Sequence, residues 1–311
     1  MTYDAGAGPR TGVLDGETVR GLVPGADLLT LVQGGEQALA DAARTARRTP
    51  EEVRELDDVR LLAPLPHPPS VRDGLCFLDH LRGSYRALGR SQELHPAWSQ
   101  GPAFYFSNAA SIVGPHDPVP VAPGSRMFDL ELEVGVVVGR GGRDLSPGSA
   151  ENHILGYTLF NDWTARDHQL RDLATGIGMG KSKDSATTLG PALVTVDELA
   201  EFRVDGRLAL ELRATVNDEE IARGRLDQMD WTFGELLAFV SRGAELAPGD
   251  VIGSGTVPGG CLLEHVDTPE LADFTGWLRP GDVVSLHGQG LGSTRQRVVE
   301  GTGVIPLRPG L

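Results

Sequence analysis

Short alternations of apolar and polar residues recur along most of the chain, and they predict a fold dominated by short strands. The clearest expected strands cover residues 130–138, 154–160, 208–216, 250–252 and 282–286. Two sequences of the same kind, Pro248-Gly249-Asp250 and Pro280-Gly281-Asp282, precede the last two of these strands. Proline fixes φ and glycine accepts a positive φ, so each sequence predicts a tight turn that leads into a strand.

Helical spacing is rarer than strand alternation. In the stretch 232–242, Phe233, Leu236, Leu237 and Val240 recur on one side of a predicted helix. A second helix is expected over residues 163–172, directly after the end of a strand. A β-rich α+β fold class follows from this balance.

The first 65 residues predict a small N-terminal α+β domain. Alternation around Asp15-Gly16 predicts a hairpin over 11–19, and helices are expected over 25–33 and 35–46. The sequence Thr49-Pro50-Glu51-Glu52 is expected to cap a further short helix.

A proline-rich stretch over residues 63–69 predicts an extended connector, because proline restricts its own φ and the residue before it. We therefore expect two units, a small domain of residues 1–65 and a larger, β-rich domain of residues 70–311.

Composition narrows the functional class. The 311 residues include 41 Gly and 21 Pro, in keeping with many turns, and a net charge of −15 argues against a nucleic-acid partner. Cys76 and Cys261 are too few for a disulfide framework. No apolar run approaches the ~18 residues of a membrane span, and the N-terminus lacks a signal pattern. A cytoplasmic protein without membrane partners is expected.

A pair of acids in the strand over 130–138 is the first candidate for chemistry. Glu131 and Glu133 share one face of that strand, because residues two apart point the same way. This pattern is common in half-solvated strands. Here the strand continues into three consecutive valines at 136–138, which favours burial on both faces, and buried carboxylates must be protonated, paired or metal-bound.

A third acid, Asp162, follows the strand over 154–160. It is also well placed to be the N-cap of the next helix. If instead it joins Glu131 and Glu133, the three carboxylates select a hard cation such as Mg²⁺, Ca²⁺ or Mn²⁺.

A glycine-rich segment over residues 176–180 leads into Lys181. The phosphate-binding loop needs a glycine where this chain has Thr175, and the spacing also misses the dinucleotide fingerprint, so a nucleotide site is rejected. Lys181 is then either a flexible loop residue or a lysine that the glycines direct into a crowded site.

Taken together and in their order along the chain, several short sequence segments resemble those of the fumarylacetoacetate hydrolase family. The resemblance covers nearly all of residues 70–300. The strongest matches are Glu-Leu-Glu at 131–133, Asn-Asp-Trp-Thr-Ala-Arg-Asp at 161–167, and Gly-Lys-Ser-Lys-Asp at 180–184 followed by Thr-Leu-Gly-Pro at 188–191. Residues 249–256 and 281–284 match as well. The resemblance implies a mixed β-sandwich roll preceded by a small N-terminal domain, a homodimer, and a Mg²⁺ or Ca²⁺ site.

The resemblance also implies roles for individual residues. Glu131, Glu133 and Asp162 match metal ligands, and Asp73 matches an additional acidic ligand. His80 falls at the position of the catalytic base, and Glu264 at that of the carboxylate that orients it. The residues matching substrate-contacting positions are Lys181, Arg166, Gln169, Thr256 and Tyr105. The chain departs from the family at Leu75 and Leu173, where fumarylacetoacetate hydrolase has substrate-binding tyrosines.

These roles predict a hydrolase that cleaves a C–C bond of a 1,3-diketo acid, with His80 activating water and the cation stabilising an enolate. Lys181 is expected to donate to the developing oxyanion. An isomerase, hydratase or decarboxylase acting on a 2-hydroxy-dienoate or β-keto acid is the alternative within enzymes. A non-catalytic protein with a structural cation is the alternative of another class. Residues 71–101 are expected to form a mobile segment that closes over the site.

Overall fold

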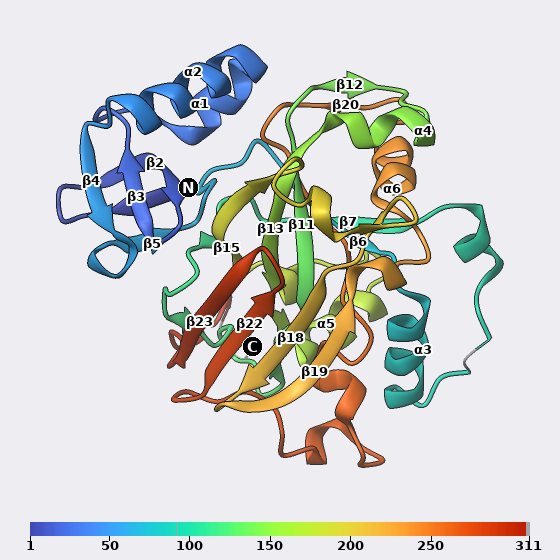
Figure 1. Ribbon diagram of the computed structural model, residues 1–311. Coiled ribbons are helices and arrows are strands. Elements are labelled where there is room, and N and C mark those ends of the chain that lie inside the picture. The colour runs from blue at the N-terminus through green and yellow to red at the C-terminus, as the bar shows by residue number, and fades with distance from the viewer. Residues whose placement is uncertain (92, 309–311) are drawn as a thin grey trace.

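Three larger sheets hold most of the strands in the computed structural model, which describes residues 1–91 and 93–308 (Figure 1). Helices are short apart from α2, and the protein has the expected β-rich α+β fold. Among these described residues, no helix combines the length and the apolar character needed to cross a bilayer.

The N-terminal sheet has the strand order β4-β3-β2-β1-β5 and lies beside the main body, in blue in Figure 1. Its strands are β1 (Thr2–Asp4), β2 (Pro9–Asp15), β3 (Thr18–Gly21), β4 (Glu52–Glu55) and β5 (Arg60–Leu62). The predicted hairpin joins β2 to β3, and Gly16 in its turn has a φ of 63°. Helices α1 (Leu28–Gln33) and α2 (Gly35–Arg48) follow the hairpin.

The N-terminal unit shares apolar core with the rest of the protein. Leu28 and Val32 of α1 pack in one cluster with Leu65, Val137 and Phe160, which belong to the connector and the central sheet. All five strands of the N-terminal sheet fall within residues 2–62. A domain boundary at residues 63–69 stays a prediction.

The central sheet is mixed and has the strand order β7-β6-β21-β11-β13-β15-β8. In that order the strands are Ala103–Ser107, Val71–Leu75, Val251–Gly253, Leu132–Val138, Ile154–Asp162, Thr187–Thr195 and Ile112–Val113. Two of the pairings, β21 with β6 and β15 with β8, are parallel, and the others are antiparallel.

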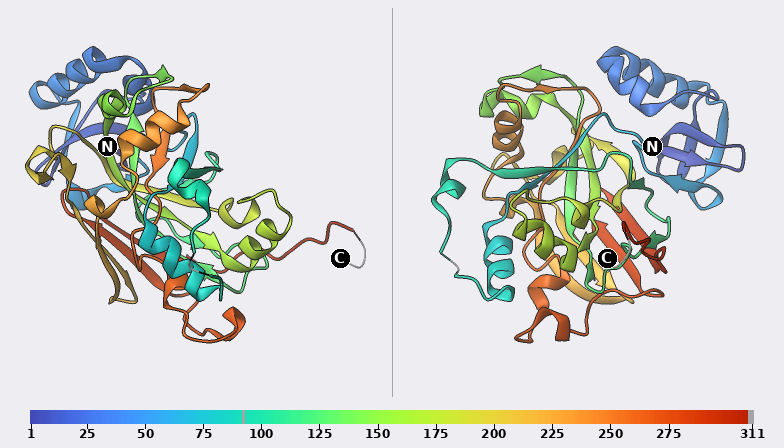
Figure 2. Two further views of the ribbon diagram at one scale, coloured as in Figure 1. Left: turned by 90° about the vertical axis from the view of Figure 1, so that its right-hand side faces the viewer. Right: turned by 180° about the vertical axis from the view of Figure 1, so that it is seen from behind.

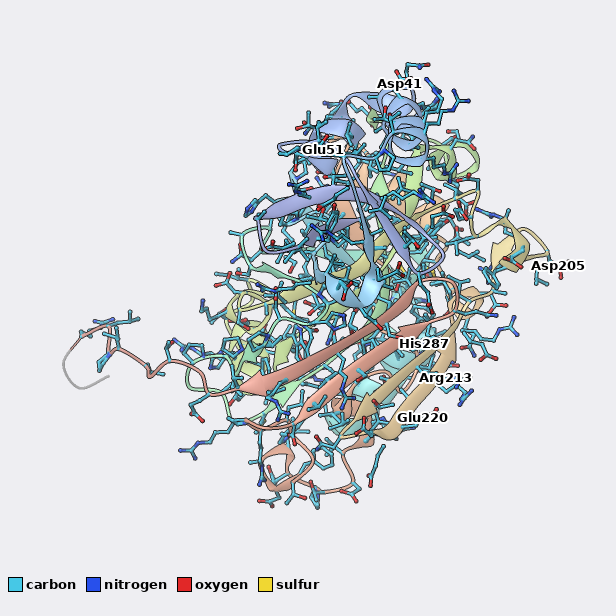
Figure 3. The ribbon with its side chains drawn as sticks, turned by 60° about the vertical axis from the view of Figure 1, so that its left-hand side comes forward. Asp41, Glu51, Asp205, Arg213, Glu220 and His287 are labelled. Atoms are coloured by element: carbon cyan, nitrogen blue, oxygen red, sulfur yellow. The ribbon has the colours of Figure 1, made fainter. Side chains whose placement is uncertain are left out.

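The third sheet has the order β19-β18-β22-β23-β9 and packs face to face on the central sheet (Figures 1 and 2). Its strands, in that order, are Glu219–Arg225, Glu211–Val216, Val283–Gly288, Gly292–Val299 and Val119–Pro120. Leu212 and Leu286 point into the core between the sheets. Figure 3 shows Arg213, Glu220 and His287 on the outer face. Inward apolar and outward polar side chains therefore alternate along these strands, as in an antiparallel sheet with one solvated face.

Smaller elements surround the sandwich. The short strand pairs are β10 (Phe128–Asp129) with β14 (Thr164–Ala165), β12 (Gly142–Arg143) with β20 (Glu245–Leu246), and β16 (Arg203–Val204) with β17 (Arg207–Leu208). The other helices are α3 (Leu78–Ala87), α4 (Pro147–Ala150), α5 (Arg166–Ala174) and α6 (Phe233–Val240). The 3₁₀ turns η1 to η8 cover 56–58, 96–100, 151–153, 181–183, 200–202, 226–228, 262–265 and 271–273.

The two Pro-Gly-Asp sequences form the predicted tight turns. Gly249 and Gly281 have φ values of 95° and 105°, which L side chains rarely adopt. In each turn the aspartate makes two hydrogen bonds to the residue three positions earlier, one through its backbone N–H and one through its carboxylate. The N–H of Asp250 donates to the carbonyl of Ala247 at 3.0 Å, and its carboxylate accepts the N–H of Ala247 at 2.9 Å. Asp282 does the same with Arg279, so both strands β21 and β22 begin from a fixed turn.

Several predicted elements differ in type or in boundaries from those of the structure. The expected short helix after Thr49 is wrong, because residues 52–55 form the edge strand β4, whose pairing with β3 outweighs the local capping signal. The strand expected over 130–138 begins at Leu132, since the chain bends where it leaves the β10–β14 pair. The strand expected over 208–216 is likewise divided into β17 and β18.

A buried polar chain connects the two packed sheets. Trp163 Nε1 donates to Thr188 Oγ1 at 2.8 Å, and Thr188 Oγ1 donates to Gln296 Oε1 of β23 at 2.7 Å. Gln296 Nε2 then donates to the carbonyls of Gly114 at 3.0 Å and Asp117 at 3.1 Å.

Replacing Thr188 with valine should therefore destabilise the protein at nearly constant shape. The variant leaves the Trp163 donor and the Gln296 acceptor without their partner, which costs about 1–3 kcal/mol. Urea unfolding measures this loss. Thr215→Val on β18, whose hydroxyl makes no side-chain hydrogen bond among the described residues, is the matched control and should change the free energy of unfolding by less than about 0.5 kcal/mol. Equal effects of both substitutions would contradict the bridging role.

Candidate metal centre and active site

Four carboxylates converge at the middle of the central sheet. One oxygen of each of Asp73, Glu131, Glu133 and Asp162 lies within 4.8 Å of the others, and all four residues are buried. Asp73 comes from β6, Glu133 from β11 and Asp162 from the end of β13, while Glu131 directly precedes β11. The structure thus brings together the four acids that the sequence nominated as metal ligands.

A glycine in the intervening strand lets these carboxylates meet. Gly253 of β21 pairs with Asp73 of β6 on one side and with Gly135 of β11 on the other. A Cβ atom at Gly253 would overlap the carboxylate of Asp73 and would lie 3.0 Å from Glu133 Oε2. The absence of a side chain therefore leaves the space in which acids from two non-adjacent strands come together.

The oxygen-only donor set and its surroundings fit a hard divalent cation. Asp162 Oδ1 is buried and has no hydrogen-bond partner among the described residues, so it retains its capacity to bind a cation. The N–H of Gly255 donates to Glu133 Oε2 at 3.0 Å and to Asp73 Oδ1 at 3.2 Å, which fixes two of the carboxylates. Asp162 is not the N-cap of the next helix, because α5 begins at Arg166 and its N-cap is Ala165.

Burial and mutual repulsion oppose the ionisation of three of these acids. Burial raises the pKa of Asp73, and burial together with the neighbouring Asp73 raises the pKa of Glu133 well above its usual range. Burial also raises the pKa of Asp162 to about 7, despite the opposing effect of Lys183. Burial acts on Glu131 as well, but there the cations of Lys183 and Arg166 outweigh it and lower the pKa to about 2.

Arg166 anchors the cluster from helix α5. Its Nη2 donates to Glu131 Oε1 at 2.7 Å, and its Nε donates to Asp129 Oδ2 at 2.7 Å. Asp129 also accepts the backbone N–H groups of Leu262 at 2.7 Å and Leu263 at 3.1 Å. The Arg166 side chain is therefore occupied by carboxylates, and Asp129 ties it to the segment that carries Glu264.

The lysine in this site is Lys183, and the prediction of Lys181 is corrected. The side chain of Lys181 is 66% exposed and pairs with Asp184, whereas that of Lys183 is 4% exposed and its Nζ donates to Glu131 and Asp162. Residues 181–183 form the 3₁₀ turn η4. With about three residues per turn, two lysines that are two positions apart point in different directions.

His80 and Glu264 form a second, adjoining pair. His80 Nδ1 and Glu264 Oε1 are 2.7 Å apart, and both side chains are buried. Glu264 Oε1 also accepts the N–H of Gly259 at 3.1 Å, which fixes the carboxylate. A Cβ atom at Gly83 would overlap this carboxylate, so the glycine lets helix α3 approach η7 closely enough for the pair to form.

Tyr105 and Thr256 also lie at the carboxylates, and Gln169 contacts Arg166. Tyr105 Oη donates to Asp73 Oδ2 at 2.8 Å and contacts Asp162. Thr256 Oγ1 donates to Glu133 Oε1 at 3.3 Å. Arg166 Nη1 donates to Gln169 Oε1 at 3.1 Å. Their hydroxyl and amide groups are thus organised by the cluster.

A cavity of about 610 Å³ opens onto both groups. Its lining includes three of the four carboxylates together with His80, Lys183, Arg166, Gln169, Tyr105 and Thr256. Helix α3, helix α5 and the segment after α5 supply much of the remaining wall. The volume is in the usual range for a small-molecule site.

The expectation of a mobile segment over residues 71–101 is wrong at its start. Residues 71–75 are the strand β6 inside the central sheet, with Asp73 buried in the cluster. Helix α3 then carries His80 with its side chain buried against Glu264. Closure by the remainder of the segment stays a prediction, and Gln92 within it lies outside the described residues.

Proteins similar to this chain in fold or sequence bear hydrolase, isomerase and tautomerase names, so the chain is placed in a class of enzymes. The chain belongs to the fumarylacetoacetate hydrolase family, since the profile of the fumarylacetoacetate (FAA) hydrolase C-terminal region matches residues 70–299.

Individual relatives agree with this assignment. The mitochondrial oxaloacetate tautomerase FAHD2A of Homo sapiens is 32% identical over 269 residues, covering 86% of this chain and 78% of its own. The fumarylacetoacetate hydrolase of Exiguobacterium antarcticum has a TM-score of 0.75 at 28% identity, with 96% of this chain and 98% of that chain covered. A maleylpyruvate hydrolase from Sphingobium, solved with manganese(II) and pyruvate, shares the fold at a TM-score of 0.71 and 21% identity, over 97% of this chain and 100% of its own.

The corrected lysine assignment can be tested by stability. In metal-free buffer, Lys183→Met leaves the buried Asp162 without its cation and removes one of the two cations beside Glu131, and removing one partner of a buried pair typically costs about 3–5 kcal/mol. Lys181→Met removes only an exposed pair, which contributes about 0–1 kcal/mol. Urea unfolding of the two variants should separate them clearly, and a larger loss in Lys181→Met would restore the original assignment.

Cation binding can be measured directly. After chelator treatment, titration of Mn²⁺ by calorimetry should show binding, and excess Mn²⁺ at 100 times Kd should add about 2.7 kcal/mol to the free energy of unfolding. Glu133→Gln and Asp162→Asn should each weaken binding, because each replaces an anionic ligand by a neutral amide. Asp79→Asn, at an aspartate that is 76% exposed on α3, is the control. Undiminished binding in both ligand variants would place the cation elsewhere.

Proposed function

We propose that the protein is a metal-dependent hydrolase that cleaves a C–C bond of a 1,3-diketo acid of the acylpyruvate class. The observation that carries the proposal is His80, which contacts Glu264 and lines the same cavity as the acidic cluster. Neither residue is needed to hold a cation, so their position speaks for chemistry on a bound molecule and against a purely structural metal site.

Asp73, Glu131, Glu133 and Asp162 would hold a divalent cation such as Mg²⁺, Mn²⁺ or Ca²⁺. When bound, the cation supplies Lewis-acid stabilisation of negative charge on the oxygens of a 2-keto acid. The manganese(II) and pyruvate in the Sphingobium hydrolase support this choice of metal class and of ligand.

His80 is arranged to take a proton from water. The Glu264 carboxylate can only accept a hydrogen bond when ionised, so its contact with Nδ1 favours the proton on that nitrogen. Nε2 is then the nitrogen that can accept a proton. Gly259 holds Glu264 in place, so the orientation of the histidine is fixed through the carboxylate.

The proposed reaction consumes one water molecule. The water oxygen bonds to the acyl carbonyl carbon while His80 takes a proton, and the bond between that carbon and the neighbouring methylene carbon breaks. Its electron pair leaves with the 2-keto acid fragment as an enolate, which receives a proton and becomes the keto acid. Lys183, buried beside Glu131 and Asp162, is placed to donate to a developing oxyanion on the substrate.

Keto–enol tautomerisation of a 2-keto acid is the second candidate, favoured by the names of the tautomerase relatives. It uses the same acidic cluster and a histidine that moves a proton, but no water is added and no C–C bond breaks. The two functions therefore differ in their products.

Product analysis by NMR with acetylpyruvate and Mg²⁺ or Mn²⁺ tests the proposal. Hydrolysis should release pyruvate and acetate in equal amounts. His80→Ala and Glu264→Gln should each lower turnover by about 10²–10⁴, the usual contribution of a positioned base. The double variant should be little worse than the poorer single variant, because the two residues act as one unit.

His287→Ala supplies the matched control for these variants, since His287 is exposed on the outer sheet face (Figure 3). It should turn over acetylpyruvate at the wild-type rate. If acetylpyruvate gives no pyruvate while enol oxaloacetate is converted to the keto form, the tautomerase function replaces the hydrolase.

A further inference from the structure

Apolar side chains form much of the cavity wall beyond the acidic cluster. Six of them are Leu75, Leu88, Phe104, Leu173, Ile177 and Met179. A keto-acid unit of six non-hydrogen atoms fills only a small part of a cavity of about 610 Å³, so a substrate must extend along this wall to be enclosed.

The wall is formed by residues of β6, β7 and α5 and by the segment that follows α5. Leu75 ends β6, and the adjacent Phe104 lies on the paired strand β7. The Phe104 ring packs edge-to-face against Phe106, with centroids 5.9 Å apart, and against Phe239 at 6.3 Å. Helix α5 supplies Leu173, and Met179 accepts a hydrogen bond from Gln169 Nε2 at its sulfur at 3.4 Å. Phe104, Phe106 and several aliphatic side chains therefore line the same space, together with the hydroxyl-bearing side chains of Ser84, Tyr85 and Tyr105.

The cations that line the cavity do not offset this apolar character. Arg166 is paired with Asp129 and Glu131, and Lys183 with Glu131 and Asp162. The third lining cation, Arg90, is exposed. An exposed guanidinium contributes little to carboxylate binding, because both groups remain hydrated when they pair.

We propose that the acyl group of the substrate is apolar, an aryl or branched alkyl group, and not a second carboxylate. This inference rests on the proposed function and specifies its substrate class. An apolar group releases water when it packs on this wall. A distal carboxylate placed against Leu75 and Leu173 would lose hydration without gaining a hydrogen-bond donor from either side chain.

Leu75 and Leu173 are the specificity-determining residues in this account. A tyrosine hydroxyl at either position could donate to a polar acyl group, whereas a leucine side chain cannot. Both leucines are half-buried and line the cavity, so both can contact a substrate that extends from the acidic cluster.

Three acylpyruvates with the same reacting unit test the proposal. They are benzoylpyruvate, succinylpyruvate, and the isostere of succinylpyruvate in which an isopropyl group replaces the distal carboxylate. We expect kcat/KM for the benzoyl and isopropyl compounds to exceed that for succinylpyruvate by at least about tenfold, since differences of one apolar group give about 10–200-fold discrimination in an apolar pocket. A preference for succinylpyruvate would overturn the proposal and leave the hydrolase function intact.

Two matched variants test whether the apolar cavity wall determines the preference for an apolar acyl group. Leu173→Gln should reduce the ratio of kcat/KM for benzoylpyruvate over succinylpyruvate at least about fivefold, because an amide replaces apolar contact surface. Leu170→Gln, on the same helix at a residue that is 38% exposed and outside the cavity lining, is the control and should preserve the ratio. An unchanged ratio in Leu173→Gln would refute the role of Leu173.

A binding measurement separates this proposal from the function on which it rests. If no acylpyruvate is hydrolysed, the hydrolase function fails, and the affinities of phenylpyruvate and oxaloacetate for the Mn²⁺-loaded protein decide the substrate class by calorimetry. Tighter binding of phenylpyruvate supports an apolar substituent. Equal or tighter binding of oxaloacetate overturns it.

Discussion

The site depends on holding four buried carboxylates together at the wall of the cavity. Repulsion and burial both act against this arrangement, and the raised pKa values of Asp73, Glu133 and Asp162 are its direct consequence. Two devices make it possible. Arg166 and Lys183 bring positive charge to Glu131 and Asp162, and Gly253 and Gly255 provide space and backbone donors for Asp73 and Glu133. Because these devices sit on separate strands, a helix and a 3₁₀ turn, the sandwich must be assembled before the cation site exists.

The sequence predicts a feature of this structure well when residues close together in the chain determine it, and poorly when residues far apart in the chain determine it. Local signals were sufficient for the β2–β3 hairpin, the Pro-Gly-Asp turns and the helix that begins at Phe233. The paired acids Glu131 and Glu133 were identified because strand geometry places alternate residues on one face, although the strand itself begins only at Leu132. The failed prediction at Thr49 shows the limit, since β4 is a strand only through its pairing with β3.

Long-range features carried weaker signals or none. Nothing near Gly253 or Gly83 in the chain indicates that a side chain there would overlap Asp73 or Glu264, because the crowding comes from strands and turns far away in sequence. The prediction of Lys181 fails for the same reason, since Lys181 and Lys183 stand in one short segment and a single 3₁₀ turn decides which of them is buried. Asp129 shows the same effect. Strand alternation alone would place it on the same face as Glu131 and Glu133, yet its carboxylate binds Arg166 and the backbone N–H groups of Leu262 and Leu263.

The charged and apolar ends of the cavity are built by different elements, and this division explains how one fold can serve several reactions. The charged end of the cavity is built by strands of the central sheet and by the buried side chains of Arg166 and Lys183, where almost any substitution would leave a charge uncompensated. The apolar end is built by the end of β6, the C-terminal part of α3, the last turn of α5 and the segment that follows it. Substitutions there alter shape and polarity without disturbing the acidic cluster, because none of those side chains pairs with a carboxylate among the described residues. The charged end of the cavity can therefore stay constant while the apolar end varies.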